Sequence, residues 1–361
     1  MAESNDRLKA FRTRIDELDR RIVELLNERA RVVIDVGKAK SGAGAATYVP
    51  EREREVLDRA VGYSEGPLSD QTISAIYREL MSGSLALEHP PRIAYLGPPG
   101  SFSHLAAERK FGASVEYESL GHISACFDEI ERGRVDLAIV PVENSLGGGV
   151  ADTLDAFVSR EVKICAELNL AVHHYLLGTG PLEAVEKVYS KPEVFAQCQS
   201  WLMETGFVSK TLSVASTSKA AEMASLDPSS AAIAGKLAGR IFRLSELADR
   251  IEDDPNNVTR FLVLGKESAK PTGDDKTAVY FNAADRPGAL VEVLDTFRRA
   301  GINMSFIQSR PSRTRRFDYA FFVDLSGHAD DDTVASAIED ARLHCTNLKV
   351  LGSFPRSTEL V

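Results

Sequence analysis

Apolar residues recur at steps of three and four between residues 8 and 40, the spacing of one face of a helix. These positions are Leu8, Phe11, Ile15, Leu18, Ile22, Leu25, Val32 and Val36, with Arg29 standing where the series calls for another apolar residue. The pattern predicts one long helix from Leu8 to about Lys40. A second helix is predicted over about Glu51 to Val61, and a third from Ser69, a suitable N-cap, to Glu88. The first segment is therefore predicted to be all α.

The long predicted helix needs a partner for its apolar seam. A helix of about 33 residues is about 50 Å long, and two shorter helices cannot cover that length. We therefore expect an intertwined dimer, with a tetramer left open.

Hydrophobic runs rich in β-branched residues alternate with helical stretches in the middle of the chain, a pattern typical of an α/β architecture. The runs are 92–96, 135–140, 162–170, 187–189, 231–234 and 261–264. From Lys276 onward the order is strand, helix, two strands, helix and strand, which is the ferredoxin-like βαββαβ pattern.

Two stretches rich in Pro, Gly and charge interrupt these patterns, LEHPPR at 87–92 and SAKPTGDDK at 268–276. They divide the chain into predicted domains at 1–90, 91–268 and 276–361.

The charge balance limits the partners. The chain has 43 Lys and Arg against 53 Asp and Glu, a formal charge of -10, so we expect no nucleic-acid or anionic-membrane binding. No apolar run approaches the roughly 18 residues of a membrane span, and the polar start MAESNDRLKA argues against a signal peptide. A cytoplasmic protein is expected.

Metal and nucleotide motifs are missing from the sequence. The four cysteines form no CxxC pair and are expected to be reduced and partly buried, while His104, His173 and His174 are expected in turns or at the surface. Neither GxxxxGK[ST] nor GxGxxG occurs. We expect no metal site and no cofactor.

Two basic residues of the long helix share a face. Arg29 and Lys40 are 11 residues apart, which leaves them within about 20° of one another and about 16 Å apart along the axis. Long side chains at that spacing can converge on one small dianion. Arg12 is turned about 100° away and more plausibly serves a second site, such as that of a partner protomer. The alternative is that Arg29 and Lys40 are solvated surface charges.

Residues 5–90 resemble the helical chorismate mutase family through Arg12, Arg29, Lys40 in VGKAK, Arg52 and Glu53 in PEREREVL, and Ser84. The resemblance implies that Arg12 of the other protomer, Arg29 and Arg52 bind the two carboxylates of chorismate. It implies that Lys40 and Glu88 hydrogen-bond the ether oxygen, and that Glu53 and Ser84 hold the hydroxyl region. A preformed cationic pocket would then select the reactive conformer of this pericyclic reaction.

Two positions depart from this pattern. Val49 stands where Asp is common, and Glu88 replaces the commoner Gln. A glutamate can donate to the ether oxygen only when it is protonated.

Segments 92–266 resemble the prephenate dehydratase family through GPPGSFSHLAA, PVENSLGGGVADTLD, YSKPEVFAQC, STSKAA and NNVTRFLVLG, in this order. The resemblance implies a two-lobed fold like the type II periplasmic binding proteins, with the site in the cleft between the lobes. The implied lining residues are Glu143, Asn144, Ser145, Gln197, Thr217, Thr259, Arg260 and Phe261. Lys191 departs from the usual His.

The implied reaction releases the ring carboxylate as CO2 and the 4-hydroxyl as water. Hydroxide is a poor leaving group and must be protonated as it departs. Thr259 and Glu143 are both candidate donors, and the sequence does not choose between them. Arg260 is the expected partner of a substrate carboxylate.

The segments Asp285 to Val291 (DRPGALV) and Gln308 to Pro311 (QSRP) resemble the ACT-domain motifs of phenylalanine-regulated enzymes, which meet across a dimer interface. The implied phenylalanine site comprises Gly288, Ala289, Leu290, Val291, Gln308, Ser309, Arg310 and Pro311. Gln308 departs from the usual Glu. A structural module without a ligand is the alternative.

Together these segments predict a bifunctional enzyme of phenylalanine biosynthesis that acts on chorismate and prephenate and is inhibited by L-phenylalanine. One rival hypothesis is a non-catalytic sensor of aromatic metabolites. A second is an enzyme in which only one of the two catalytic domains is active.

Overall fold

The computed structural model describes residues 2–40, 48–88, 90–311, 319–357 and 360–361. Contacts within the chain define two compact units. The first comprises residues 1–48, 55–91 and 111–116, and the second comprises residues 49–54, 92–110 and 117–361. No described helix is long and apolar enough to cross a membrane.

The first unit is helical, as predicted. Helix α1 (Ala2–Lys40) packs against α3 (Asp70–Glu88), and α2 (Pro50–Gly62) lies between them in the sequence. The Ser69 hydroxyl accepts a hydrogen bond from the backbone N–H of Thr72 at 3.2 Å, which confirms Ser69 as the N-cap of α3. Much of the apolar seam of α1 remains exposed in this single chain, with Phe11 56% and Ile15 55% accessible.

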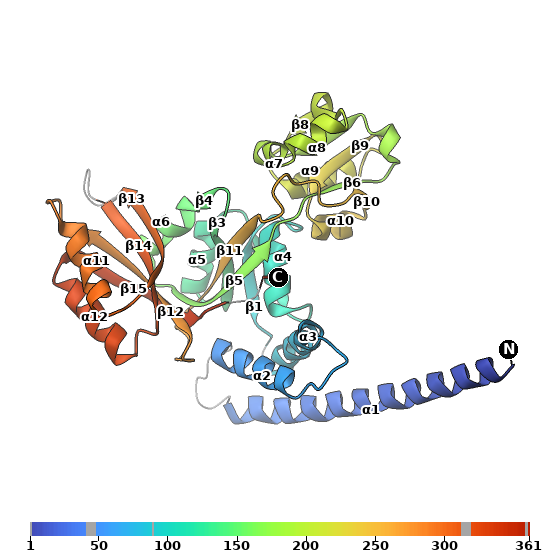
Figure 1. Cartoon of the computed structure of the whole chain (residues 1–361), viewed down its shortest axis with the longest axis horizontal. Helices are drawn as coiled ribbons and strands as arrows, with labels where there is room; N and C mark the ends of the chain where they lie inside the picture. Colours follow the sequence, from blue (N-terminus) through green and yellow to red (C-terminus); the bar gives the residue numbers. More distant parts are fainter. Residues whose placement is uncertain (1, 41–47, 89, 312–318, 358–359) are drawn as a thin grey trace. The chain divides into compact units, whose positions relative to one another are not determined.

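A mixed sheet forms the first lobe of the second unit, with strand order β2-β1-β3-β11-β5 and β4 paired to β3 (Figure 1). Its strands are β1 (Arg92–Leu96), β2 (Glu116–Leu120), β3 (Leu137–Asn144), β4 (Gly148–Gly149), β5 (Lys163–Ala171) and β11 (Val258–Gly265). The helices that accompany it are α4 (Phe102–Phe111), α5 (Ile123–Glu131) and α6 (Ala151–Ser159). Strand β11 returns from the second lobe to pair with both β3 and β5.

The second lobe has its own sheet, with strand order β10-β6-β9-β7-β8. Its strands are β6 (Tyr175–Gly178), β7 (Lys187–Ser190), β8 (Thr211–Ser213), β9 (Ser230–Ala234) and β10 (Ser245–Ala248). Its helices are α7 (Pro192–Gln197), α8 (Gln199–Glu204), α9 (Thr217–Ala224) and α10 (Lys236–Phe242), with 3-10 turns η1 (Leu182–Ala184) and η2 (Phe207–Lys210). Only residues 172–174 and 249–257 connect the two sheets within this stretch, so the lobes share a two-segment hinge.

The C-terminal part of the second unit is a βαββαβ module, which confirms the ferredoxin-like prediction. Its sheet has the order β13-β14-β12-β15, and α11 and α12 lie together on one face of it (Figure 1). The elements are β12 (Asp275–Ala283), α11 (Ala289–Arg299), β13 (Met304–Pro311), β14 (Tyr319–Ser326), α12 (Asp332–Arg342) and β15 (Cys345–Pro355). The other face shares a hydrophobic core with the first lobe, through residues such as Phe322 and Phe354.

Candidate active sites and regulatory pocket

The contact between α1 and α3 brings together three of the residues expected to bind chorismate. The Arg29 guanidinium donates to the Ser84 hydroxyl at 2.6 Å. About two turns after Arg29 along α1, Gly37 lies so close to Glu88 that a Cβ at Gly37 would be 3.1 Å from the Glu88 Cγ. The missing side chain at Gly37 therefore lets the two helices approach where Glu88 lies.

The remaining charged residues of the helical set lie elsewhere. Lys40 ends α1, and its side chain lies outside the described part of the structure. Arg12 is exposed on α1, 17 residues and thus about 26 Å from Arg29, so it does not join that cluster within one protomer.

Arg52 and Glu53 are in the first turn of α2, in the segment that belongs to the second unit. Arg52 is exposed, whereas Glu53 forms a largely buried ion pair with Lys110 at 2.9 Å. The Val49 carbonyl accepts hydrogen bonds from the backbone N–H groups of both residues at 3.1 Å. Glu53 is thus paired with Lys110 inside the second unit.

Thr259 and Asn144 are cross-strand partners near the ends of β11 and β3, two inner strands of the first sheet. The Asn144 side-chain amide donates to the Thr259 hydroxyl oxygen at 2.9 Å and to the Asn257 amide oxygen at 2.8 Å. The Asn144 amide oxygen accepts from the backbone N–H groups of Leu146 and Gly147, at 3.0 and 2.9 Å. Both ends of this amide are therefore fixed, and its N–H groups point at Thr259.

Gln197, at the end of α7 in the second lobe, is also part of this cluster of hydrogen-bonded polar side chains. Its amide oxygen lies 2.9 Å from His174 Nε2 and 3.5 Å from the Asn257 side-chain nitrogen. Asn257 and His174 lie in the two hinge segments, and both are buried. Burial lowers the pKa of His174 despite the hydrogen bond that its ring makes to Gln197.

Ser145 and Thr217 also flank the region between the lobes. Ser145 pairs with the start of β11, its hydroxyl accepting from the backbone N–H of Val258 at 3.0 Å. Thr217 is the first residue of α9, whose N-cap Ser216 accepts from the Lys219 N–H at 3.0 Å. The neighbouring Ser218 hydroxyl donates to the Pro99 carbonyl, so the Gly97 to Ser101 turn of the first lobe touches α9 of the second.

The Arg260 guanidinium forms ion pairs with two carboxylates of the protein and is largely buried. Its guanidinium contacts Glu167 at 2.8 Å and Asp324 of the βαββαβ module at 2.5 Å, and Lys276 contacts Glu167 at 2.9 Å. The four side chains are at most 14% exposed. The cluster balances two cations with two carboxylates, and this placement argues against Arg260 as the partner of a substrate carboxylate.

Three other residues are more buried than the sequence predicts. Phe261, expected to line the cleft, is only 1% exposed and packs in the interior. His174, expected in a turn or at the surface, is 1% exposed. His104 is partly buried and stacks on Tyr95 with ring centroids 4.5 Å apart. Among the described residues no cluster of His, Cys, Asp and Glu could hold a metal ion.

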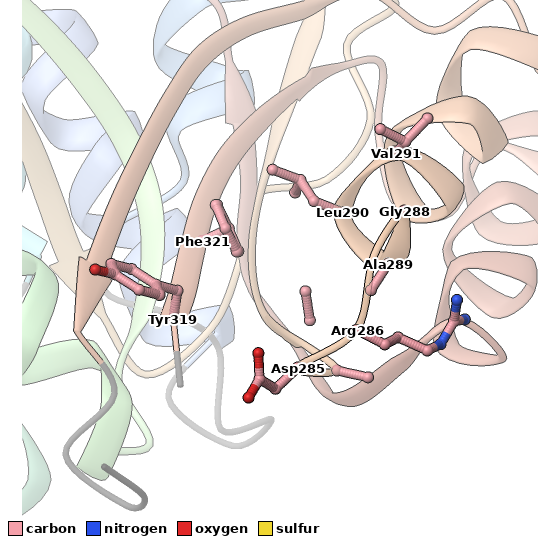
Figure 2. A pocket seen from close by; sticks show the side chains of 10 residues that line it. Asp285, Arg286, Gly288, Ala289, Leu290, Val291, Tyr319 and Phe321 are labelled. Carbon is pink, nitrogen blue, oxygen red and sulfur yellow. The ribbon is translucent and has the colours of Figure 1, made fainter. Parts of the chain in front are cut away.

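A pocket of about 220 Å³ opens at the start of α11 (Figure 2). Figure 2 shows Gly288 and Ala289 on one side of it and the side chains of Tyr319 and Phe321, from β14, on the other. Gly288 has a φ of +83°, a left-handed conformation that favours glycine at the turn before the helix. Leu290 and Val291 complete the apolar wall.

The QSRP segment does not reach this pocket within one chain. Gln308 lies over Gly149 of β4, where a Cβ on the glycine would be 2.9 Å from its side-chain oxygen. Arg310 forms an ion pair with Asp155 of α6 at 3.2 Å. Pro311 ends β13, the edge strand of the module, and Ser309 lies on the same strand. Their role in a phenylalanine site stays a prediction that requires a second protomer.

Three family models match the chain in the predicted order. They are chorismate mutase type II over residues 11–89, prephenate dehydratase over 93–269 and the ACT domain over 277–343. The bifunctional chorismate mutase/prephenate dehydratase of Stutzerimonas stutzeri is 41% identical over 359 residues, which cover 98% of each chain. The chain belongs to this bifunctional family.

Solved structures resemble about three quarters of the chain. The prephenate dehydratase of Arthrobacter aurescens in complex with L-Phe is 32% identical, with a TM-score of 0.69 over 73% of this chain and 90% of that chain. A chain described as GqqA, a novel type of quorum quenching acylase, is 27% identical, with a TM-score of 0.68 over 74% of this chain and 98% of that one.

Membership of the family establishes an enzyme with a chorismate mutase domain, a prephenate dehydratase domain and a regulatory ACT domain. It confirms the fold predicted for each segment and does not favour a sensor without catalytic activity. Family membership does not by itself assign a role to each residue. Asn257 and His174 belong to the cluster of hydrogen-bonded side chains around Thr259, although the sequence did not assign them to the site. The only sequence signal for Asn257 was the NN that opens the NNVTRFLVLG motif.

Proposed function

We propose that this protein rearranges chorismate to prephenate in domain 1–90 and converts prephenate to phenylpyruvate, CO2 and water in domain 91–268. L-Phenylalanine bound to domain 276–361 inhibits the second reaction. The family models and the full-length relatives support the two activities, and the L-Phe complex of the Arthrobacter aurescens dehydratase supports the effector. The cytoplasmic location expected from the sequence stays a prediction.

The hydrogen bond from Asn144 to Thr259 is the observation that carries the dehydratase mechanism. An amide nitrogen only donates, so the Thr259 oxygen accepts this bond and the hydroxyl proton of Thr259 is directed elsewhere. That proton is available to the departing 4-hydroxyl of prephenate. As the ring C–CO2 bond breaks, its electron pair enters the ring and the C–OH bond breaks, and the leaving oxygen takes the Thr259 proton and departs as water. The Thr259 oxygen, which accepts the Asn144 N–H, regains a proton from solvent before the next turnover.

The strand register favours Thr259 over Glu143 as this donor. Thr259 pairs with Asn144, and Arg260 pairs with Glu143, in successive positions of β11 and β3. Because successive side chains of a strand leave opposite faces, Glu143 starts on the face of Arg260. Thr259, Asn144 and the hinge residue Asn257 share the other face.

In the mutase domain, Arg29 and Ser84 form the preformed part of the site, and Glu88 lies against the same stretch of α1 as Gly37. We assign Arg29 to a substrate carboxylate and Lys40 and Glu88 to the ether oxygen. The exposed apolar seam of α1 and the exposed Arg12 support a homodimer in which Arg12 completes the partner's site.

The purified protein incubated with chorismate tests this proposal. Prephenate and phenylpyruvate are followed separately, with prephenate supplied alone in a parallel reaction and L-phenylalanine added to half of the samples. We expect both products in sequence and inhibition of the second step. Accumulation of prephenate without phenylpyruvate would show that the dehydratase domain is inactive, and no turnover of chorismate would show the same for the mutase domain.

A further inference from the structure

His174 lies in the hinge segment between β5 and β6, where the chain crosses from the first sheet to the second. Its backbone N–H donates to Glu252 at 2.9 Å and its carbonyl accepts from the N–H of Ile251 at 2.9 Å. These bonds tie it to the other hinge segment. The ring is buried against Phe102, with ring centroids 5.6 Å apart at an interplanar angle of 81°. The ring is therefore held by both lobes.

The ring has a single defined polar contact. Nε2 lies 2.9 Å from the amide oxygen of Gln197, and an amide oxygen only accepts, so Nε2 carries the proton. Nδ1 is buried without a hydrogen-bond partner among the described residues. A buried ring whose Nδ1 has no hydrogen-bond partner is in the neutral form, with a single N–H group. That N–H group is at Nε2 and points at Gln197.

From Gln197 the hydrogen bonds continue to the proposed acid. The Asn257 side-chain nitrogen lies 3.5 Å from the same Gln197 oxygen, and its own oxygen accepts from Asn144 at 2.8 Å. Asn144 then donates to Thr259 at 2.9 Å. The backbone N–H groups of Leu146 and Gly147 fix the Asn144 amide, and Asn144 in turn fixes the Asn257 oxygen. The Asn257 nitrogen then faces the Gln197 oxygen, which is the atom that His174 contacts.

We propose that His174 is a positioning residue for the dehydratase reaction. By donating to the Gln197 oxygen, the neutral ring fixes which end of the Gln197 amide faces His174 and Asn257. The same contact holds Gln197 beside the Asn257 nitrogen, so it supports from the hinge side the Asn257 orientation that receives the Asn144 N–H. Asn144, which the backbone N–H groups of Leu146 and Gly147 also hold, then keeps Thr259 as an acceptor whose own proton is free to leave. This role rests on the proposed function of Gln197 and Thr259.

Two substitutions of His174 separate the donor from the packing. His174→Phe keeps an aromatic ring against Phe102 but removes the N–H, and we expect dehydratase kcat/KM to fall about tenfold, the value of one buried hydrogen bond. His174→Gln supplies an amide N–H in place of the ring N–H, and we expect it to restore most of that loss. His173→Phe is the matched control, because His173 contacts Glu252 at 2.7 Å rather than Gln197.

A double-mutant cycle with Gln197→Ala decides whether His174 acts through Gln197. We expect Gln197→Ala alone to lower dehydratase activity, and His174→Phe to add little in that background. Mutase activity of the same samples, measured on chorismate, should be unchanged in every variant and reports the integrity of the protein. Each variant is also compared for its melting temperature.

Failure of the role of His174 and failure of the proposed role of Gln197 give different results. Full additivity of His174→Phe and Gln197→Ala, or no rescue by His174→Gln, would make His174 a packing residue and overturn this inference. Full dehydratase activity in Gln197→Ala would instead remove Gln197 from the proposed site, and with it the route by which His174 acts.

Discussion

The guanidinium of Arg260, on β11 of the dehydratase domain, lies 2.5 Å from the carboxylate of Asp324 on β14 of the ACT domain. Arg260 directly follows Thr259, whose side chain leaves the opposite face of the same strand. The ACT domain therefore contacts β11 on the face opposite to the one that carries Thr259, the proposed acid. Strand β14 also carries Tyr319 and Phe321, which line the pocket beside α11.

Removing Arg260 should destabilise the protein rather than only weaken substrate binding. Arg260→Ala leaves Glu167 and Asp324 buried with Lys276 as their remaining cation, and breaking a buried pair in this way costs about 3 to 5 kcal/mol. Urea unfolding followed by circular dichroism measures the loss. Arg298→Ala, which breaks an ion pair whose arginine is 72% exposed, is the control and should change stability by less than about 1 kcal/mol.

A different result would restore the sequence-based role of Arg260. If Arg260→Ala unfolds at the wild-type urea concentration but shows a much higher KM for prephenate, the arginine serves the substrate carboxylate and the buried cluster is dispensable.

The sequence predicted the elements that have a strong period and missed those that do not. The helices of the mutase domain and the βαββαβ order followed from regular spacing of apolar residues, and the structure confirms them. Strands β2, β4, β6, β8 and β10 were missed. They are five residues or shorter, and β2 (EYESL) has few apolar residues.

One expectation at the site conflicts with the geometry of a strand. Motif resemblance assigned Thr259 and Arg260 to one cleft, although neighbours on a strand leave opposite faces. Alternation alone would have separated Arg260 from Thr259. His174 could not have been assigned, because its role depends on two hinge segments that are about 80 residues apart in the sequence and meet only in the folded chain.

Replacing the Thr259 hydroxyl should abolish dehydratase turnover while leaving substrate binding. Thr259→Val keeps the shape of the side chain but removes the proton for the leaving hydroxyl, and we expect kcat to fall by about 10² or more. Steady-state kinetics on supplied prephenate measures kcat, and calorimetry measures binding. Glu143→Gln is the companion variant, and a larger fall there than in Thr259→Val would make Glu143 the acid.

The mutase reaction should depend on the protonation of Glu88. Only a protonated Glu88 can donate to the ether oxygen, so mutase kcat should fall as pH rises and Glu88 loses its proton. Glu88→Gln, whose amide donates at every pH, should flatten this profile. Dehydratase activity on supplied prephenate is the control in each sample. A Gln variant with the wild-type pH profile would exclude a proton-donating role for Glu88.

Native protein should resist thiol alkylation at pH 8. Burial raises the pKa of Cys126, Cys165 and Cys198 to about 12, so these thiols stay protonated and are poor nucleophiles at that pH. Cys345 is less buried, and burial still raises its pKa. Iodoacetamide labelling with mass spectrometry should therefore modify Cys345 first, and all four in urea. Rapid labelling of Cys198 in native protein would contradict the described packing around α7 and α8.

L-Phenylalanine should inhibit the dehydratase reaction through the pocket beside α11. Truncation before Lys276 is a poor test, because Lys276 and Asp324 belong to the buried cluster and Phe354 to the core shared with the first lobe. A point substitution avoids this problem. Val291 lines the pocket and is 67% exposed, so Val291→Asp should leave the fold intact while placing a charge on the apolar wall.

We expect wild-type enzyme to lose affinity for prephenate when phenylalanine binds, by roughly 5- to 150-fold for a coupling of about 1 to 3 kcal/mol. Reciprocity requires prephenate to weaken phenylalanine binding by the same factor. Val291→Asp should abolish inhibition while keeping kcat, whereas Leu343→Asp, at an 81% exposed position after α12 and outside this pocket, should behave as wild type. Calorimetry that shows identical phenylalanine binding with and without saturating prephenate would disprove the coupling, and equal inhibition of Val291→Asp would place the effector elsewhere.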